Sequence, residues 1–483
     1  MVCRAASSRR LLVGLVVAWA SGPVTAFAAD PVPPPAAPGS PASPAGPSPR
    51  AMTLSDSIAY AHAHEPAIMT ALAQVKTELA NAKVPRAAWQ PTFAASAQIF
   101  AATSNNTTAS YLATDSMAIP RIGGSTSVSE SGAGWQPYAS TFVGVSALQE
   151  VFDFGTIAAR AAVADANVAV TRHGADAQRL DVELSVEEAY FGVYAAKGVL
   201  KASEDAYERA KTHRDLAKAG VQSGLRSPIE LTRAEATLSQ YEIGRIRAKG
   251  GVDLAQSVLA ASMGAPDMAV DVSGPAPTLA ELPSLADAIR TAADKDPLLA
   301  EAVARLAAQE KTTTAIGAAL RPNLFATGTI SGRAGGEAAS GAGAIPGGSG
   351  FVPDVPNWDV GLILSWTLFD GVTVASRKAS EVAEGARKEE IALFREREVA
   401  AVTQGYVRVS VARDAVPALR GAVRGALANY AQADARFQAG LGNAVELADA
   451  EALRTDAEVQ LAIGLFDVAR ARAIFGRAIA EGL

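Results

Sequence analysis

Apolar residues recur at alternating spacings of four and three along two long stretches of this chain, residues 156–218 and 374–436. The repeating positions at the end of the first stretch are Val193, Ala196, Leu200, Ser203, Tyr207, Ala210, Ala217 and Val221. Those of the second are Val409, Ala412, Val416, Leu419, Val423, Ala426, Ala433 and Phe437, and Arg214 and Tyr430 fill the one omitted step. A four-three repeat is typical of a coiled-coil seam. At 1.5 Å per residue each stretch predicts a helix of roughly 90–95 Å, much longer than the helices of a compact enzyme.

A second pattern, strict alternation of apolar and polar residues, predicts β-strands. Phe93, Ala95, Ala97 and Ile99 share one face of the segment that begins at Thr92. Trp358, Val360, Leu362, Leu364 and Trp366 share a face of a later segment, and Val143 and Val145 occupy the equivalent place in the first half. Alternation over about ten residues is typical of transmembrane barrel strands, and aromatic residues suit both membrane interfaces, which makes Trp358 and Trp366 candidate interface residues. A half-buried strand of a soluble protein is the alternative.

Each long helical stretch ends in the same kind of turn, within residues 219–235 and 435–451. At one constant shift Gly224 coincides with Gly440, Leu225 with Leu441, and Glu230 with Glu446. Glycine adopts the positive φ that ends a helix, and an apolar pattern resumes a few residues later. The chain is therefore expected to form two helical hairpins, whose tips carry Val221, Gly224, Leu225, Phe437, Gly440 and Leu441.

The hairpins belong to an internal repeat. Leu54, Asp56, Ile58, Pro66 and Pro91 correspond, at another constant shift, to Leu285, Asp287, Ile289, Pro297 and Pro322. Each half is predicted to run helix, strand, strand, long helix, tip and return helix. The expected organisation is a signal peptide (1–28), a Pro/Ala-rich linker (29–50), a first repeat (51–265), an inter-repeat linker (266–283) and a second repeat (284–483).

Charge and cysteine usage narrow the class of protein. Three arginines at positions 4, 9 and 10 precede an apolar run and the Ala26-Phe27-Ala28 cleavage site of a secretory signal. The only cysteine, Cys3, lies before that run, so the mature chain is expected to have no disulfide, thiolate metal site or cysteine nucleophile. Loss of the three arginines takes the formal net charge from −6 to −9, which disfavours nucleic-acid binding. The mature chain also lacks a run of about 18 apolar residues, so any entry into a membrane would have to be by β-strands.

In their order and spacing these features resemble the TolC family of trimeric outer-membrane efflux and secretion channels. The resemblance spans residues 51–483 and rests on the paired halves, the two tips, Arg321-Pro322-Asn323-Leu324 and Leu368-Phe369-Asp370-Gly371. It implies a mainly α fold, in which a long coiled-coil α-barrel is continuous with a transmembrane β-barrel. Each chain of a homotrimer would give four strands to a shared twelve-stranded barrel in the lipid of a Gram-negative outer membrane, with the helices extending into the periplasm.

The resemblance also implies a function. The chain would be a porin-like channel, an exit duct for efflux or type I secretion, coupled by a periplasmic adaptor (membrane fusion) protein to a proton-driven or ATP-driven inner-membrane pump. Its hairpin tips would contact the adaptor. No cofactor, metal site or enzymatic activity is expected, because the chain has no phosphate-binding glycine loop or nucleophile elbow, and His62 and His64 point in different directions on a helix. A periplasmic coiled-coil adaptor and a structural envelope protein are the alternatives, but neither explains two hairpins with two strand pairs.

Two site residues follow from the same resemblance. Family members narrow their periplasmic entrance with acidic rings just after the second tip, where this chain has Glu446 and Asp449. Three copies of each would form a six-carboxylate constriction that favours cations; alternatively, both residues simply solvate a helix face. Phe437 and Gly442 stand where some members use a Tyr and an Arg to latch the tips, so apolar packing of Phe437 is expected instead of a polar latch.

Overall fold

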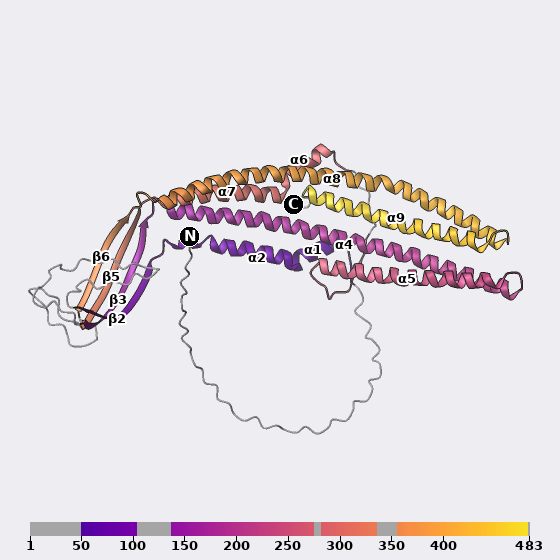
Figure 1. Cartoon of the computed structure of the whole chain (residues 1–483), viewed down its shortest axis with the longest axis horizontal. Helices are drawn as coiled ribbons and strands as arrows, with labels where there is room; N and C mark the ends of the chain where they lie inside the picture. The colour runs from indigo at the N-terminus through magenta and orange to yellow at the C-terminus, as the bar shows by residue number, and fades with distance from the viewer. Residues whose placement is uncertain (1–49, 104–136, 275–281, 336–354, 482–483) are drawn as a thin grey trace, which may run out of the picture. The chain divides into compact units, whose positions relative to one another are not determined.

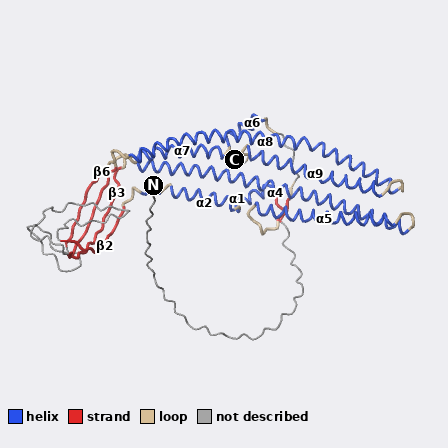
Figure 2. Tube along the Cα trace, viewed as in Figure 1, coloured by secondary structure: helices blue, strands red, loops and turns tan. Residues whose placement is uncertain are grey.

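The computed structural model describes residues 50–103, 137–274, 282–335 and 355–481, which belong to one compact unit (Figure 1). The predicted signal peptide and nearly all of the first linker lie outside the described residues and stay predictions. Helices account for most of the described chain, and the strands form one four-stranded sheet and one small two-stranded sheet (Figure 2).

The two halves carry the same series of elements, except that the short helix α3 of the first half has no counterpart in the second. The first contains β1 (Arg50–Met52), α1 (Leu54–His64), α2 (Pro66–Asn81), α3 (Val84–Ala87), β2 (Thr92–Thr103), β3 (Pro137–Phe152), α4 (Thr156–Gln222) and α5 (Pro228–Ser262). The second contains β4 (Val270–Val272), α6 (Leu285–Lys295), α7 (Pro297–Ala318), β5 (Asn323–Gly335), β6 (Val355–Ser365), α8 (Gly371–Gln438) and α9 (Ala444–Ala478).

Matching local chemistry begins each half. Thr53 caps α1 in a capping box with Asp56, and Ser284 caps α6 by accepting a hydrogen bond from the backbone N–H of Asp287. Pro66 and Pro297 then open α2 and α7 at the first helical position, where the missing N–H of proline is harmless. The opening helical segment of each half is therefore divided at a proline, between α1 and α2 and between α6 and α7.

The two long helices are the main struts of the molecule. α4 has 67 residues and α8 has 68, which corresponds to roughly 100 Å each. α5 packs along the far part of α4, and α9 along the far part of α8, while α2 and α7 cover the parts nearer the sheet (Figure 1). The predicted seam is packed: the buried members are Val193, Ala210, Ala217, Val409, Val416, Ala426, Ala433 and Phe437. Pro417 is exposed and α8 continues through it.

The larger sheet is antiparallel in the order β2-β3-β5-β6. Its register places the predicted apolar residues on one common face, for example Ala95, Val145, Ile330 and Trp358 in one row across the four strands. Ser146, Thr327 and Thr329 occupy the opposite face and are buried. One face of the sheet is therefore apolar and exposed, and the other polar. β6 ends at Ser365, so Trp366 lies just beyond the strand rather than on it, with an exposed side chain.

Aspartates make the transition from strand to long helix in both halves. Asp370 accepts hydrogen bonds from the backbone N–H groups of Val372 and Thr373 as the N-cap of α8. Asp153 accepts from the N–H groups of Gly155, whose φ is +90°, and Ile157 at the start of α4. An aspartate thus accepts backbone N–H bonds at the start of each long helix. Asp153 directly follows β3, whereas β6 already ends at Ser365, before Asp370.

A short parallel pairing joins the start of the chain to the segment between the repeats. β1 pairs with β4, from Arg50 opposite Val270 to Met52 opposite Val272. The sequence did not predict these two strands, because three residues are too few to show an alternation. It assigned β4 to the inter-repeat linker and β1 to the boundary between the first linker and the first repeat. Met52, Val270 and Val272 belong to a buried apolar cluster together with α4 and α5 side chains. A second cluster packs α6 against α8 and α9 around Phe475. In the described part of the chain, no helix has the length and apolar character needed to cross a membrane.

Candidate functional site at the hairpin tips

The two hairpin tips have the same backbone geometry. Gly224 and Gly440 have φ of +73° and +72°. The N–H of Leu225 donates to the carbonyl of Gly220 at 2.9 Å, and the N–H of Leu441 donates to that of Arg436 at 2.9 Å. These bonds satisfy carbonyl groups that the end of a helix would otherwise leave without partners. The next helix begins with Pro228 at its first position in one tip and with Asn443 as its cap in the other.

Each tip presents an apolar side chain to solvent at the same position. Leu225 is 84% exposed and Leu441 is 76% exposed. Ile229 and Val445, which coincide at the same shift, are exposed as well, although neither was among the candidate residues. The repeat could have identified them, because both are apolar at matching positions of the restarting helices.

Phe437 has a different environment from the two leucines. Its side chain is only 4% exposed and packs with Ala433, Leu447 and Ala450 of its own hairpin, while a role in latching the tips stays a prediction. The Arg226 guanidinium adds a polar contact that was not expected. Its carbon lies 3.8 Å from the Phe437 ring centroid, and its Nη2 donates to the Phe437 carbonyl at 3.0 Å. Arg226, which also pairs with Glu230, therefore joins the first tip to the second.

The two acidic candidates lie in the first turns of α9. The backbone N–H of Glu446 donates to the Asn443 side chain at 2.8 Å, and its carboxylate pairs with Arg436 of α8 at 3.2 Å. Asp449 is exposed three residues further along the helix. Both residues are thus available on the surface of the chain, and Arg436 is a nearby opposite charge that the sequence analysis did not consider.

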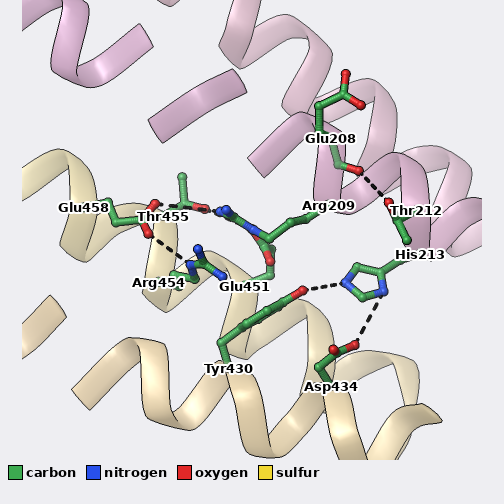
Figure 3. Close-up of polar contacts among 10 residues, drawn as sticks. All are labelled: Glu208, Arg209, Thr212, His213, Tyr430, Asp434, Glu451, Arg454, Thr455 and Glu458. Carbon is green, nitrogen blue, oxygen red and sulfur yellow. Dashed lines mark hydrogen bonds and ion pairs between the residues drawn. The ribbon is translucent and has the colours of Figure 1, made fainter. Parts of the chain in front are cut away.

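A polar cluster lies between the hairpins above the tips (Figure 3). Arg209 of α4 donates from Nε to Glu451 of α9 at 2.8 Å, and Arg454 pairs with Glu458 at 3.0 Å. His213 Nε2 is hydrogen-bonded to the Tyr430 hydroxyl of α8 at 2.9 Å. In Figure 3 the His213 ring lies between Tyr430 and Asp434, and its Nδ1 is 4.0 Å from the Asp434 carboxylate. The cluster connects α4 to both helices of the second hairpin.

Burial is the largest cause of the pKa shifts in this cluster. It lowers the pKa of His213, raises the pKa of the Glu451 carboxyl and raises the pKa of Tyr430 to about 12. The sequence pattern does not reveal the contacts of His213, since its partner Tyr430 lies more than 200 positions away in the chain. The described residues contain no group of three or more His, Cys, Asp or Glu side chains arranged to hold a metal ion.

Comparison with known proteins identifies the family. The sequence model described as "Outer membrane efflux protein" matches residues 58–265 and 288–473. The chain belongs to the outer membrane efflux protein family. The resemblance to TolC-type channels, drawn from the paired halves and the tips, is thereby confirmed.

Solved structures share the fold. The chain is similar to the outer-membrane channel OprN, with a TM-score of 0.67 at 18% identity over 89% of this chain and 90% of that one. It is also similar to the Campylobacter jejuni CmeC outer membrane channel, with a TM-score of 0.67 at 16% identity over 89% and 86% of the two chains. The fold class predicted from the sequence, helices of an α-barrel continuous with a β-barrel, is confirmed. As a family member the protein is located in the outer membrane and extends into the periplasm.

One curated relative matches a short part of the chain. It is the fusaric acid resistance protein FusA of Burkholderia cepacia, 33% identical over 94 residues, which are 20% of this chain and 18% of that protein. The chain thus aligns with less than a fifth of the length of that relative. Both the family and the fold are those of channels rather than of enzymes.

Proposed function

We propose that this protein is the outer-membrane exit duct of an efflux assembly, in which a homotrimer binds a periplasmic adaptor and, through it, an inner-membrane pump. The sheet supports the homotrimer. Among the described strands, β2 and β6 each pair on one side only, so their outer backbone groups are free to pair with other copies. Three copies would complete the twelve-stranded barrel, with Trp358 and Trp366 near the lipid interface.

The exposure of one leucine at each tip is the observation that best supports the proposed contact with an adaptor. Leu225 and Leu441 occupy equivalent positions, have the same backbone geometry and are largely exposed. Two apolar side chains held out by one repeated turn suit a partner that binds both tips alike. The proposed contact surface therefore consists of Val221, Gly224, Leu225, Gly440, Leu441 and the newly recognised Ile229 and Val445. Phe437, also a candidate from the sequence, is expected to act on this surface through internal packing.

The adaptor contact is tested by a double variant, Leu225→Asp with Leu441→Asp. We expect it to insert as a trimer but to lose export and cross-linking to the adaptor, since two charges would be placed in an apolar contact. The matched control, Leu225→Met with Leu441→Met, keeps the surface apolar and should export normally. Gly224→Pro or Gly440→Pro should act like the Asp variant, because proline cannot adopt the positive φ. Normal export by the Asp double variant would contradict the proposal that the tips bind the adaptor.

The fusaric acid resistance relative favours efflux of small organic molecules over type I secretion of a polypeptide. A strain that lacks this protein should become more sensitive to fusaric acid, and the wild-type gene should restore resistance. Unchanged sensitivity, together with loss of a secreted polypeptide from the medium, would support type I secretion instead.

A further inference from the structure

The helices of the two hairpins form a row with two open edges. In the described chain α4 packs against α5 on one side and α9 on the other, and α9 packs in turn against α8 (Figure 1). The order across the row is therefore α5-α4-α9-α8, with α5 and α8 at its edges. By the internal repeat, α8 is equivalent to α4, and α5 to α9. A contact between the edges of two copies would thus join the same two kinds of helix as the α4–α9 contact within one chain.

One stripe of α4 that lies against α9 has an exposed equivalent on α8. The stripe on α4 consists of Gly198, Ala202, Ala206 and Arg209. Its two ends contact Ala462 and Glu451 of α9, and the two alanines between them are buried. At the constant shift that relates the two tips, the equivalent residues of α8 are Asp414, Ala418, Ala422 and Gly425. All four are exposed, so α8 presents to solvent a surface that α4 buries.

The other side of the contact shows the same difference. Glu451 of α9 is buried, whereas its equivalent on α5, Glu235, is exposed. Ala462 corresponds to Ile246, whose side chain is 60% exposed, and Leu254 extends this exposed apolar face two turns further along α5. Apolar surface of this kind indicates a contact with a partner, and the repeat identifies the partner as a second copy of the chain.

The charges at the two edges are complementary. Asp414 of α8 stands where α4 has Gly198, and within its own chain it pairs only with the adjacent Arg413, at 3.5 Å. In the equivalent contact it would face Ile246 of α5. Lys249 lies three residues beyond Ile246, on the same side of the helix, is exposed, and has no ion-pair partner among the described residues. A carboxylate on one edge would therefore lie near an ammonium group on the other.

We propose that α8 of one copy packs against α5 of the next in the register of α4 against α9, with Asp414 beside the partner's Ile246 and in an ion pair with the partner's Lys249. The inference rests on the proposed homotrimer and adds which helices meet and in which register. Gly198 allows a close approach of α4 and α9. Asp414 is larger, so the contact between copies is wider at this point, which leaves room for the carboxylate to reach the ammonium group.

Disulfide trapping tests the register. A Cβ at Gly198 would lie 2.9 Å from that of Ala462. A disulfide needs about 3.5–4.5 Å between Cβ atoms, which suits the slightly wider contact proposed between copies. In a Cys3→Ser background, Asp414→Cys with Ile246→Cys should therefore form covalent dimers and trimers when the detergent-purified protein is mildly oxidised. Each of the two cysteine variants alone should run as a monomer on a denaturing gel.

A mismatched pair is the control for the register. Asp414→Cys with Leu254→Cys moves one thiol about 12 Å along α5, so it should not cross-link. Native mass spectrometry of the same samples separates two kinds of failure. A monomeric protein would overturn both the homotrimer and this inference. A trimer in which the matched pair cross-links no faster than the mismatched pair would overturn the register alone.

A charge swap tests the ion pair. Lys249→Asp places two carboxylates at the contact and should lower the temperature at which the trimer dissociates. Adding Asp414→Lys should restore this temperature, because the exchanged charges attract again. The matched control is Lys201→Asp, an exposed position of α4, which lies between α5 and α9 and away from both edges. Its trimer should dissociate as wild type does. If the double variant dissociates at the same temperature as Lys249→Asp alone, the proposed ion pair does not form.

Discussion

Glu398 of α8 is a carboxyl group buried near the junction of α6 and α7. Burial and the neighbouring Asp296 carboxylate raise its pKa from 4.5 to about 7, against the opposing effect of Arg395. Between these two values the folded protein holds a proton that the unfolded chain releases. The contribution of Glu398 to stability is therefore fully present below about pH 4.5 and is lost as the pH rises to about 7.

Glu398→Gln should remove this dependence, because the amide stays neutral at every pH. We expect the melting temperature of the variant, relative to wild type, to rise progressively between pH 4.5 and 7 and then to stay level. Glu396→Gln, on an exposed position of the same helix, is the control and should shift the curve by a constant amount. A constant offset in the Glu398 variant as well would show that this carboxyl titrates normally.

Arg226 links the hairpins through one aromatic ring and one carbonyl, both of Phe437. A partly buried cation–π contact is worth about 0.5–2 kcal/mol. We expect Arg226→Gln and Phe437→Leu each to speed amide hydrogen exchange at the tips, and the double variant to speed it by less than the two effects combined. Arg226→Lys keeps the charge but not the planar fork, so its effect should be smaller than that of Arg226→Gln. Strictly additive effects would mean that the two side chains do not interact.

At the scale of the element, the contact between α4 and α9 depends on a glycine. A Cβ at Gly198 would lie 2.9 Å from the Cβ of Ala462, and neither atom can move by side-chain rotation. Gly198→Ala should therefore push the helices apart and cost about 1–3 kcal/mol of stability. Gly250→Ala on α5 is the matched change, because a Cβ there meets no atom of the described structure within 4 Å. It should gain about 0.5–1 kcal/mol from helix propensity, so thermal melts of the two variants should shift in opposite directions.

The elements that the sequence predicts correctly are those with a regular pattern. The four-three seam located α4 and α8, and the alternation through Phe93 and Trp358 located strands with the correct faces. In each case one residue type recurs at the period of one element, so no knowledge of distant partners is needed.

The features that were missed depend on contacts between distant parts of the chain. α4 packs against α5 on one side and α9 on another, so a single seam describes only part of its buried surface. Arg214 was placed in that seam, yet it is the neighbouring His213 that makes the contact with Tyr430 between the hairpins. The Arg226–Phe437 contact and the buried Glu451 escaped prediction for the same reason, since their partners come from the other repeat.

At the scale of the whole molecule, the acidic residues after the second tip acquire a role only through threefold symmetry. Glu446 and Asp449 are three residues apart on α9, so they share a face and would stack as two rings in a trimer. Each Glu446 has Arg436 beside it at 3.2 Å, and the pair is largely exposed. Arg436 therefore offsets part of the negative charge at the entrance, and an exposed pair of this kind contributes little to stability.

These charges predict opposite effects of two changes on ion selectivity. Glu446→Gln with Asp449→Asn should weaken cation preference and remove block by divalent cations in single-channel recordings, because six carboxylates leave the constriction. Arg436→Gln should do the reverse and strengthen cation preference, since Glu446 would lose its opposite charge. Both variants should insert as trimers with normal melting behaviour, because the groups are exposed. If neither change alters selectivity or divalent block, then Glu446 and Asp449 only solvate the surface of α9 and the constriction lies elsewhere.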